Sequence, residues 1–287
     1  MKKTIILNLL IMFTCPFFTH AQWLEKKGNG YFKLSAWSLE ADQHYTNSGK
    51  IDPNATRGVF NLNLYAKYGL SDNWDMIAYI PFYVKSYQNN QVSQITNETL
   101  LKGEEFNSFG DMNLGIEYRF FKKSKYAFST TLTLGIPSGD SKGGSDGSYQ
   151  TGDGEFNQII RFNAGTSFSL YKHSFYAKSY IGFNNKTKNY SDEVRAGIEL
   201  GTSFIGSKLI LLLRSNMVKS IKNGSLNASN SSGSIFANNV EFISIGGEVA
   251  WKFTKKIGIG IGYSSAISGK IIYVAPSYSA GIFYLLK

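Results

Sequence analysis

Residues 109–121 read FGDMNLGIEYRFF, and from Asp111 to Phe120 polar or small residues alternate with apolar ones. Successive side chains of an extended chain point to opposite faces, so this pattern predicts a β-strand with one polar and one apolar face. Glu117 and Arg119 belong to the polar face, while Leu114 belongs to the apolar one. The stretch therefore predicts a strand that separates two different environments.

The segments that follow repeat this pattern. After a short basic turn, 122–125, the residues YAFSTTLTLGIP at 126–137 alternate again. A glycine- and aspartate-rich segment, 138–155, then leads to a third alternating stretch at 156–171. The unit is strand, short turn, strand, long loop, strand, and the rest of the chain shows the same order.

The N-terminus predicts export. Lys2 and Lys3 precede the apolar run Thr4–Phe18, and a small residue, Ala21, follows shortly after. These are the parts of a secretory signal peptide, residues 1–21, cleaved after Ala21. The apolar run is shorter than the ~20 residues that a membrane-spanning helix needs, which disfavours a retained anchor.

The only cysteine, Cys15, lies in this predicted signal peptide. Cleavage removes it, so we expect no disulfide and no thiolate metal site in the mature chain. Lipid attachment to Cys15 is the alternative, but Thr14 before it and Pro16 after it fit a lipoprotein signal poorly.

Charge and composition exclude some classes of function. Loss of Lys2 and Lys3 lowers the formal net charge from +10 to +8. A basic chain can bind nucleic acid. Here the lysines lie singly in turns rather than in a stripe, so we expect no nucleic-acid partner. The chain is 43% hydrophobic and 15% aromatic, yet no mature segment is long and apolar enough for a transmembrane helix.

Alternation with a period of two recurs to the C-terminus and predicts an all-β chain of twelve strands within residues 22–287. The predicted strands are 30–40, 57–69, 74–87, 109–121, 126–137, 156–171, 174–184, 194–204, 209–219, 239–253, 257–268 and 271–286.

The connections alternate in length. Short turns at 70–73, 122–125, 172–173, 205–208 and 254–256 alternate with longer polar segments at 41–56, 88–108, 138–155, 185–193 and 220–238. The last connection, at Gly269–Lys270, departs from this alternation and predicts a tight hairpin. Such alternation is typical of a transmembrane, antiparallel up-and-down β-barrel of the outer membrane, with its turns in the periplasm and its loops outside.

Aromatic residues flank the short turns, as expected for a girdle at a lipid interface. They are Tyr68, Trp74, Phe120, Phe121, Tyr126, Tyr171, Phe175, Phe204, Trp251 and Phe253. A secreted β-sandwich shares the period of two and remains the alternative. It gives no reason for aromatics beside every second turn, so we favour the barrel with outer-membrane lipid as its surroundings.

Lipid disfavours charges at mid-depth, so the polar strand faces must point into the lumen. We therefore predict seven charged lumen-lining residues: Glu117, Arg119, Arg161, Lys178, Arg195, Glu199 and Arg214. Lys67, Glu248 and Lys252 also belong to the inward strand faces. Paired inside a barrel of this size, they would line or plug the passage.

No catalytic residue and no cofactor are predicted. His44, near Asp42, lies in the first long loop and His173 in a short turn, where a solvated or turn residue is the simpler interpretation. The loop carboxylates Asp140, Asp146 and Asp153 offer oxygen ligands to a cation such as Ca²⁺. Their spacing matches no EF-hand and also fits ordinary turn chemistry, so we predict no metal site.

Three motifs resemble a known family. They are GDMNLGIEYRFF, LTLGIPSGD and YQTGDGEFNQ, with YAKYGLSDNWDMIAYIPFY before them, and together they cover about residues 57–165. They resemble the phenol-degradation meta-pathway outer-membrane barrels, which are distantly like fatty-acid and aromatic-hydrocarbon channels. The resemblance implies passage of small, hydrophobic or aromatic compounds across the outer membrane.

The leading hypothesis is a passive outer-membrane channel for small solutes. The alternatives are a non-transporting surface or adhesive barrel, which would act through its loops, and a barrel hydrolase that would depend on His44. The sequence specifies neither the solute nor the oligomeric state.

Overall fold

The computed structural model describes residues 25–93, 95–171, 173–226 and 234–287. The predicted signal peptide, 1–21, lies outside these residues. Within them, no helix is long and apolar enough to cross a membrane.

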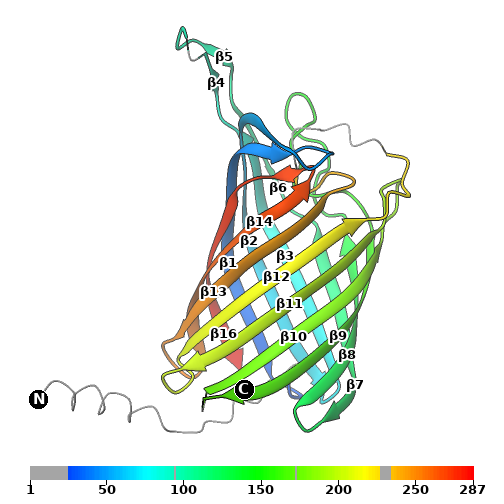
Figure 1. Cartoon of the computed structure of the whole chain (residues 1–287), viewed down its shortest axis with the longest axis vertical. Coiled ribbons are helices and arrows are strands. Elements are labelled where there is room, and N and C mark those ends of the chain that lie inside the picture. The colour runs from blue at the N-terminus through cyan, green and yellow to red at the C-terminus, as the bar shows by residue number, and fades with distance from the viewer. Residues whose placement is uncertain (1–24, 94, 172, 227–233) are drawn as a thin grey trace, which may run out of the picture.

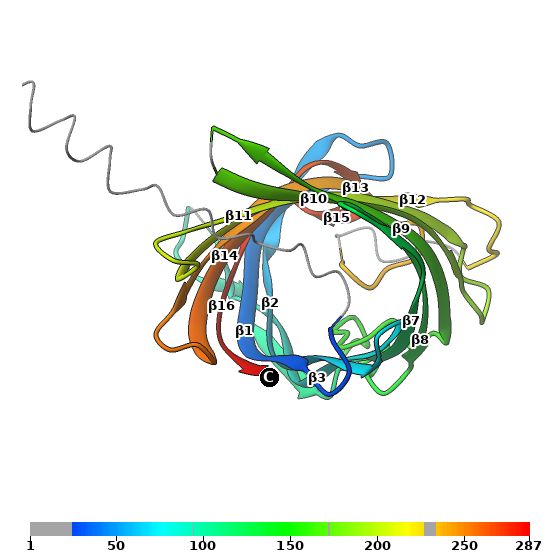
Figure 2. The ribbon, with the colours of Figure 1, turned by 90° about the horizontal axis from the view of Figure 1, so that it is seen from below.

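Twelve antiparallel strands of the described chain form one closed barrel (Figure 1). β1 pairs with both β2 and β16, which closes the ring seen along its axis in Figure 2. The barrel strands are β1 (Gly30–Tyr45), β2 (Ile51–Ser71), β3 (Trp74–Gln88), β7 (Met112–Lys123), β8 (Tyr126–Ile136), β9 (Asn157–Leu170), β10 (His173–Asn185), β11 (Glu193–Phe204), β12 (Leu209–Ser220), β13 (Glu241–Lys252), β14 (Ile257–Lys270) and β16 (Pro276–Leu286). The predicted all-β barrel of twelve strands is confirmed.

Four shorter strands lie at the long-loop end. β4 (Gln91–Val92) and β5 (Thr99–Leu101) pair only with each other, in the hairpin that projects at the top of Figure 1. β6 (Glu104–Ser108) extends the pairing of β3, and β15 (Ile272–Tyr273) pairs with the end of β1. Pairing to the barrel rim therefore orders part of the predicted loops.

The tight hairpin predicted at Gly269–Lys270 is wrong. β14 continues through Lys270, which pairs with Glu241 of β13. The connection follows it at residues 271–275 and carries β15. The amide of Ile271 donates to the carbonyl of Tyr45 at 2.8 Å, so pairing with β1 replaces the expected turn.

The predicted first loop, 41–56, is also wrong. β1 and β2 stay paired as far as Tyr45 and Ile51, and the turn is confined to residues 46–50. Gly49 in this turn has a φ of +82°, which glycine adopts without a Cβ clash. The polar composition suggested a loop, but backbone pairing continues beyond the apolar part of the strands.

The opening segment, 109–121, becomes a barrel strand only from Met112. Pro81 of β3 has no N–H to donate, so the ladder is interrupted there. The amide of Gly110 instead donates to the Pro81 carbonyl at 2.8 Å. β6 pairs with β3 on one side of this interruption and β7 pairs on the other.

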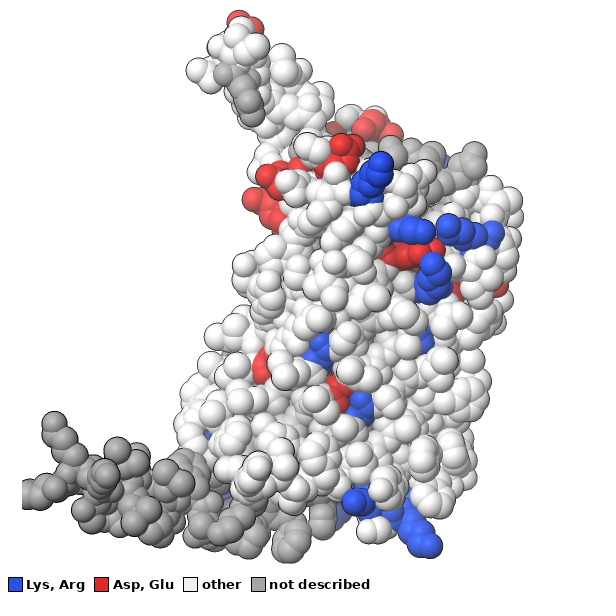
Figure 3. Space-filling view, in the orientation of Figure 1, with Lys and Arg blue, Asp and Glu red and all other residues white. Residues whose placement is uncertain are grey.

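The outer surface carries the apolar strand faces. Charged side chains gather at the two ends of the barrel in Figure 3, and the belt between them is mostly uncharged in that view. Exposed aromatics contact one another near the short turns: Trp74 stacks on Tyr118 at 4.5 Å and Phe168 on Phe175 at 5.6 Å between ring centroids. This arrangement fits an apolar belt edged by an aromatic girdle.

Candidate functional site: a charged lumen with two adjoining cavities

The interior of the barrel contains a cavity of about 480 Å³, which we call the lower cavity. Alternation along the strands turns the polar side chains of β2, β7, β9, β10, β11 and β12 into it. Seven charged side chains among the described residues line it: Lys67, Glu117, Arg161, Lys178, Arg195, Glu199 and Arg214. Six of them are predicted lumen-lining residues, and the other, Lys67, lies on a strand face that was also expected to point inward.

A chain of ion pairs crosses one side of the lower cavity. Arg214 Nε lies 2.6 Å from Glu199 Oε2, and Arg214 Nη1 lies 3.1 Å from Glu248 Oε2. Lys33 Nζ approaches the other oxygen of Glu248 at 2.6 Å. The hydroxyl of Tyr176 donates to Glu199 Oε1 at 2.8 Å. The carboxylates therefore hold Arg214 against the wall.

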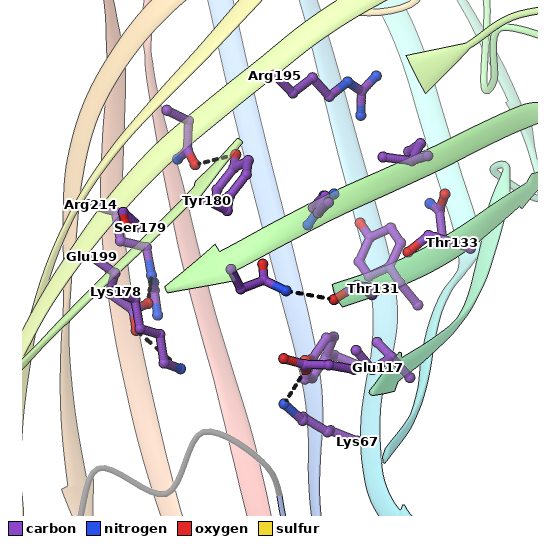
Figure 4. Close-up of a pocket in the computed structure, with 18 of the residues that line it drawn as sticks. Lys67, Glu117, Thr131, Thr133, Lys178, Ser179, Tyr180, Arg195, Glu199 and Arg214 are labelled. Atoms are coloured by element: carbon purple, nitrogen blue, oxygen red, sulfur yellow. Dashed lines mark hydrogen bonds and ion pairs between the residues drawn. The ribbon is translucent and has the colours of Figure 1, made fainter. Parts of the chain in front are cut away.

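A second cluster lies on the opposite side, as Figure 4 shows for Lys67 and Glu117. Lys67 Nζ is 2.8 Å from Glu117 Oε2 and 3.2 Å from Asp75 Oδ2. Asp75 is fully buried and also accepts the amide of Glu25 at 2.9 Å. Ser129 Oγ donates to Glu117 Oε1 at 2.5 Å. Buried charges need such partners, so this cluster fixes its side chains in place.

A second space of about 500 Å³, the upper cavity, lies toward the long loops. It shares four lining residues with the lower cavity, and we call this level the waist: Arg161, Tyr180, Arg195 and Asn216. The guanidinium carbon of Arg161 lies 5.1 Å from the ring centroid of Tyr180. The Tyr180 hydroxyl donates to Asn216 Oδ1 at 3.0 Å.

The upper cavity has two unlike walls. Its charged wall is a network in which Arg195 donates to Glu193 through Nε and Nη2, at 2.9 and 2.6 Å. Lys186 bridges Glu193 at 3.0 Å and Asp153 at 3.2 Å. The other lining residues are mainly apolar, with Ser244, Ser264, Ser265 and Ser277 among them. We call the apolar ones the apolar wall: Trp37, Leu39, Val218, Ile235, Ala237, Val240, Phe242, Ala266, Ile272, Tyr273 and Ala275.

Arg119, the seventh residue expected in the lumen, is not among the described residues that line either cavity. Its Nη2 donates to the backbone carbonyl of Asp72 in the turn between β2 and β3. The pairing of β7 with β8 shifts register between Arg119 and Phe121, so the regular alternation ends there. Periodicity alone did not reveal this bulge.

The three loop aspartates Asp140, Asp146 and Asp153 make separate contacts. Asp146 Oδ1 accepts the amide of Ser148 at 2.9 Å, and the carbonyl of Asp140 accepts that of Thr151 at 2.9 Å. Asp153 faces Lys186 instead. The described residues contain no group of three or more His, Cys, Asp or Glu placed to hold a metal ion.

The two histidines of the predicted mature chain lie at opposite ends of the barrel. His44 belongs to β1 and pairs with Asp52 and Tyr273, so its predicted loop position is wrong. It is only 6% exposed, which leaves it little access to a substrate at the rim. His173 begins β10, and its ring lies 5.2 Å from that of Phe204.

Several residues of the site were not predicted from the sequence, among them Lys33, Asp75, Tyr176, Tyr180, Lys186 and Glu193. Tyr176 and Tyr180 share the inward parity of Lys178 on β10, which is the signal that identifies them. Tyrosine is equally common in the outer girdle, so residue type alone hides this role.

The comparisons with known proteins agree on the architecture alone. No family model matches the chain, so the resemblance to phenol-degradation barrels is not confirmed. No curated protein matches it.

Solved outer-membrane barrels are similar in structure. An outer membrane channel from Pseudomonas putida F1 matches with a TM-score of 0.59 at 13% identity, covering 91% of this chain and 96% of that one. The transport unit of the autotransporter AIDA-I from Escherichia coli gives 0.50 at 8%, covering 93% and 94%. The translocator domain of the autotransporter NalP from Neisseria meningitidis gives 0.50 at 9%, covering 92% and 91%. The chain therefore has the fold of the outer-membrane β-barrels.

Proposed function

We propose that this chain resides in the outer membrane and is a channel through which small solutes, preferably anions, diffuse passively. The observation that carries the proposal is the hollow interior. The lower and upper cavities share four lining residues at the waist, so together they occupy successive levels of the barrel interior. Twelve strands lie between eight-stranded barrels, which side chains fill, and open porins of ~16 strands.

The lining charges support a preference for anions. Five cationic and two acidic side chains of the described residues line the lower cavity. An excess of one sign in a confined space raises the local concentration of the opposite ion. The apolar wall of the upper cavity supports the solute class that the family resemblance implies, small hydrophobic or aromatic compounds.

Planar-bilayer recording tests this function. The refolded chain should give discrete conductance steps, and its reversal potential in a KCl gradient should favour chloride. The double variant Arg161→Gln, Lys178→Gln should lower that preference. The matched control Lys122→Gln, Lys123→Gln, at a short turn, should not. Folded barrel without conductance would overturn the channel.

A second candidate, an adhesive surface barrel, is favoured by one observation. The β4–β5 hairpin projects beyond the rim, and Ile95 at 94%, Leu100 at 70% and Leu101 at 52% exposure face solvent. Exposed apolar groups of this kind are typical of binding surfaces. Deleting residues 89–103 should abolish attachment of expressing cells to a surface without changing conductance. A change in conductance alone would reject adhesion.

A further inference from the structure

The apolar wall of the upper cavity is unusual for a lumen. Inward positions of transmembrane barrel strands are normally polar, because they face water. Here Trp37 and Leu39 of β1 and Phe242 of β13 line the cavity, together with Ile235 from the segment before β13. Water against such a wall is unfavourable, and an apolar body that displaced it would gain free energy.

Arg161 faces this space from the waist, and no described residue forms an ion pair with it. Arg195 and Arg214 each donate to carboxylates at 2.6 Å. Among the described residues, by contrast, none places a carboxylate within ion-pair distance of Arg161, whose guanidinium contacts the ring of Tyr180. Its Nε is buried and has no hydrogen-bond partner in the described part of the chain. Guanidinium stays charged and matches a carboxylate through two parallel hydrogen bonds.

These two features meet in one cavity. Arg161 and the apolar side chains line the same space of about 500 Å³. Sites for small organic ligands typically measure ~300–1,000 Å³ and combine apolar walls with few polar anchors. A ligand that uses both features has one anionic end and one apolar body.

We propose that the upper cavity is a binding site for amphipathic monocarboxylates, such as aromatic or medium-chain aliphatic acids. The carboxylate pairs with Arg161 at the waist, and the apolar body lies against Trp37 and Phe242, which are only partly buried, whereas Leu39 lies behind Trp37 in a buried cluster. This assignment names the solute class of the proposed channel and rests on that function. A small inorganic anion could pair with Arg161 but would displace no water from the apolar wall. A neutral aromatic compound could displace that water but would not pair with Arg161.

Three probes separate the contribution of the carboxylate from that of the apolar body. Benzoate carries a carboxylate and an aromatic ring, acetate carries only the carboxylate, and benzyl alcohol carries only the ring. At constant ionic strength, benzoate should reduce chloride conductance at concentrations at least tenfold below those of acetate or benzyl alcohol. Arg161→Gln should remove this advantage, and Trp37→Ala should reduce it severalfold. Arg161→Lys should retain only part of it, because an ammonium lacks the guanidinium fork.

Arg119→Gln is the matched control, since it removes an arginine that lies outside both cavities. Its response to benzoate should equal that of the unmodified chain. Each variant is first tested for heat-modifiable gel mobility, which reports a folded barrel.

Failure of this inference differs from failure of the channel. A conducting protein that responds equally to benzoate and acetate overturns the carboxylate site and leaves the channel intact. If nothing conducts, titration calorimetry with benzoate on the folded protein in detergent tests the site alone. Heat of binding that Arg161→Gln removes supports the site, and its absence overturns it.

Discussion

The ring of Tyr180 on β10 lies over Gly197, its direct register partner on β11. A Cβ built on Gly197 would approach the Tyr180 ring to 2.5 Å and Asn216 Oδ1 to 2.8 Å. An aromatic side chain that covers a cross-strand glycine stabilises a sheet at this point. The absence of a side chain at Gly197 therefore allows the Tyr180 ring to lie where Arg161 contacts it at the waist.

We expect Gly197→Ala to displace Tyr180, because the new methyl group needs the space of the ring. Overpacking of this kind typically costs ~1–3 kcal/mol. The variant should unfold at a lower urea concentration in detergent and show altered chloride conductance. Gly201→Ala, where the Cβ meets the ring of Tyr176, should lower stability similarly while leaving Arg161 and Tyr180 in contact. Unchanged stability of Gly197→Ala would contradict the packing.

Removal of Arg214 should destabilise the barrel and weaken its preference for anions. Arg214→Ala leaves Glu199 without its 2.6 Å partner and takes one partner from Glu248. The side chain of Arg214 is 38% exposed, so solvent screens the pair, and we expect a loss of only ~1–2 kcal/mol. Urea unfolding measures it, with Lys255→Ala in a short turn as the control. Restoration of stability by a second change, Glu199→Gln, would identify the unpaired carboxylate as the cause.

The outer face of β8 should reject charge. Leu132 is 52% exposed and is paired with Ile116 and Ile160, which are exposed as well. If this face meets lipid, Leu132→Arg should cost ~2–4 kcal/mol near mid-depth. Thr133→Arg, one residue along but facing the lower cavity, is the matched control and should cost less. Folding into lipid vesicles distinguishes the two, and equal effects would argue against a lipid-facing surface.

The loop between β8 and β9 should lose stability as pH rises through about 6. Asp111 holds this loop by accepting the amides of Gly139 at 2.9 Å and Asp153 at 2.7 Å. Burial, and then the nearby Asp153 carboxylate, raise the pKa of Asp111 to about 6 from its ordinary 3.8. The folded loop thus favours the protonated form, so this contribution is complete below about pH 4 and is lost through pH 6.

Hydrogen exchange of residues 137–156, corrected for intrinsic rates, measures this change. Asp153→Asn removes the neighbouring negative charge and should move the transition to lower pH. An unchanged transition in that variant would show that another group controls the loop.

Strand periodicity predicted most of the fold, for reasons visible in single segments. Residues 126–137 alternate without interruption, and β8 covers nearly the same range, Tyr126–Ile136. The paired arms of β1 and β2 around residues 41–56 were expected to be a loop, because polar residues beyond the apolar belt carry no alternation signal. β15 was not predicted, because this two-residue strand forms only by pairing with the end of β1, which is distant in sequence.

The site was predictable in composition but not in pairing. The alternation of side chains along each strand predicted that Glu199 and Arg214 point inward. Only the register between β11 and β12 shows that they are direct partners. The pairing of Lys67 with Asp75 and Glu117 needs three adjacent strands in correct register. That no described carboxylate pairs with Arg161 is also a consequence of register, since the Glu193 carboxylate faces Arg195 instead.

The pairing of β1 with β16 also constrains how the protein is assembled. Gly30 lies opposite Leu286, so the first barrel strand gains its second neighbour only when the last strand is present. Until then, both strands expose unpaired backbone groups, which hydrocarbon does not tolerate. Contacts between residues so far apart in sequence also form slowly. A chain that lacks its final strand therefore leaves the edges of β1 and β14 unpaired, and the barrel is closed only when β16 pairs with both.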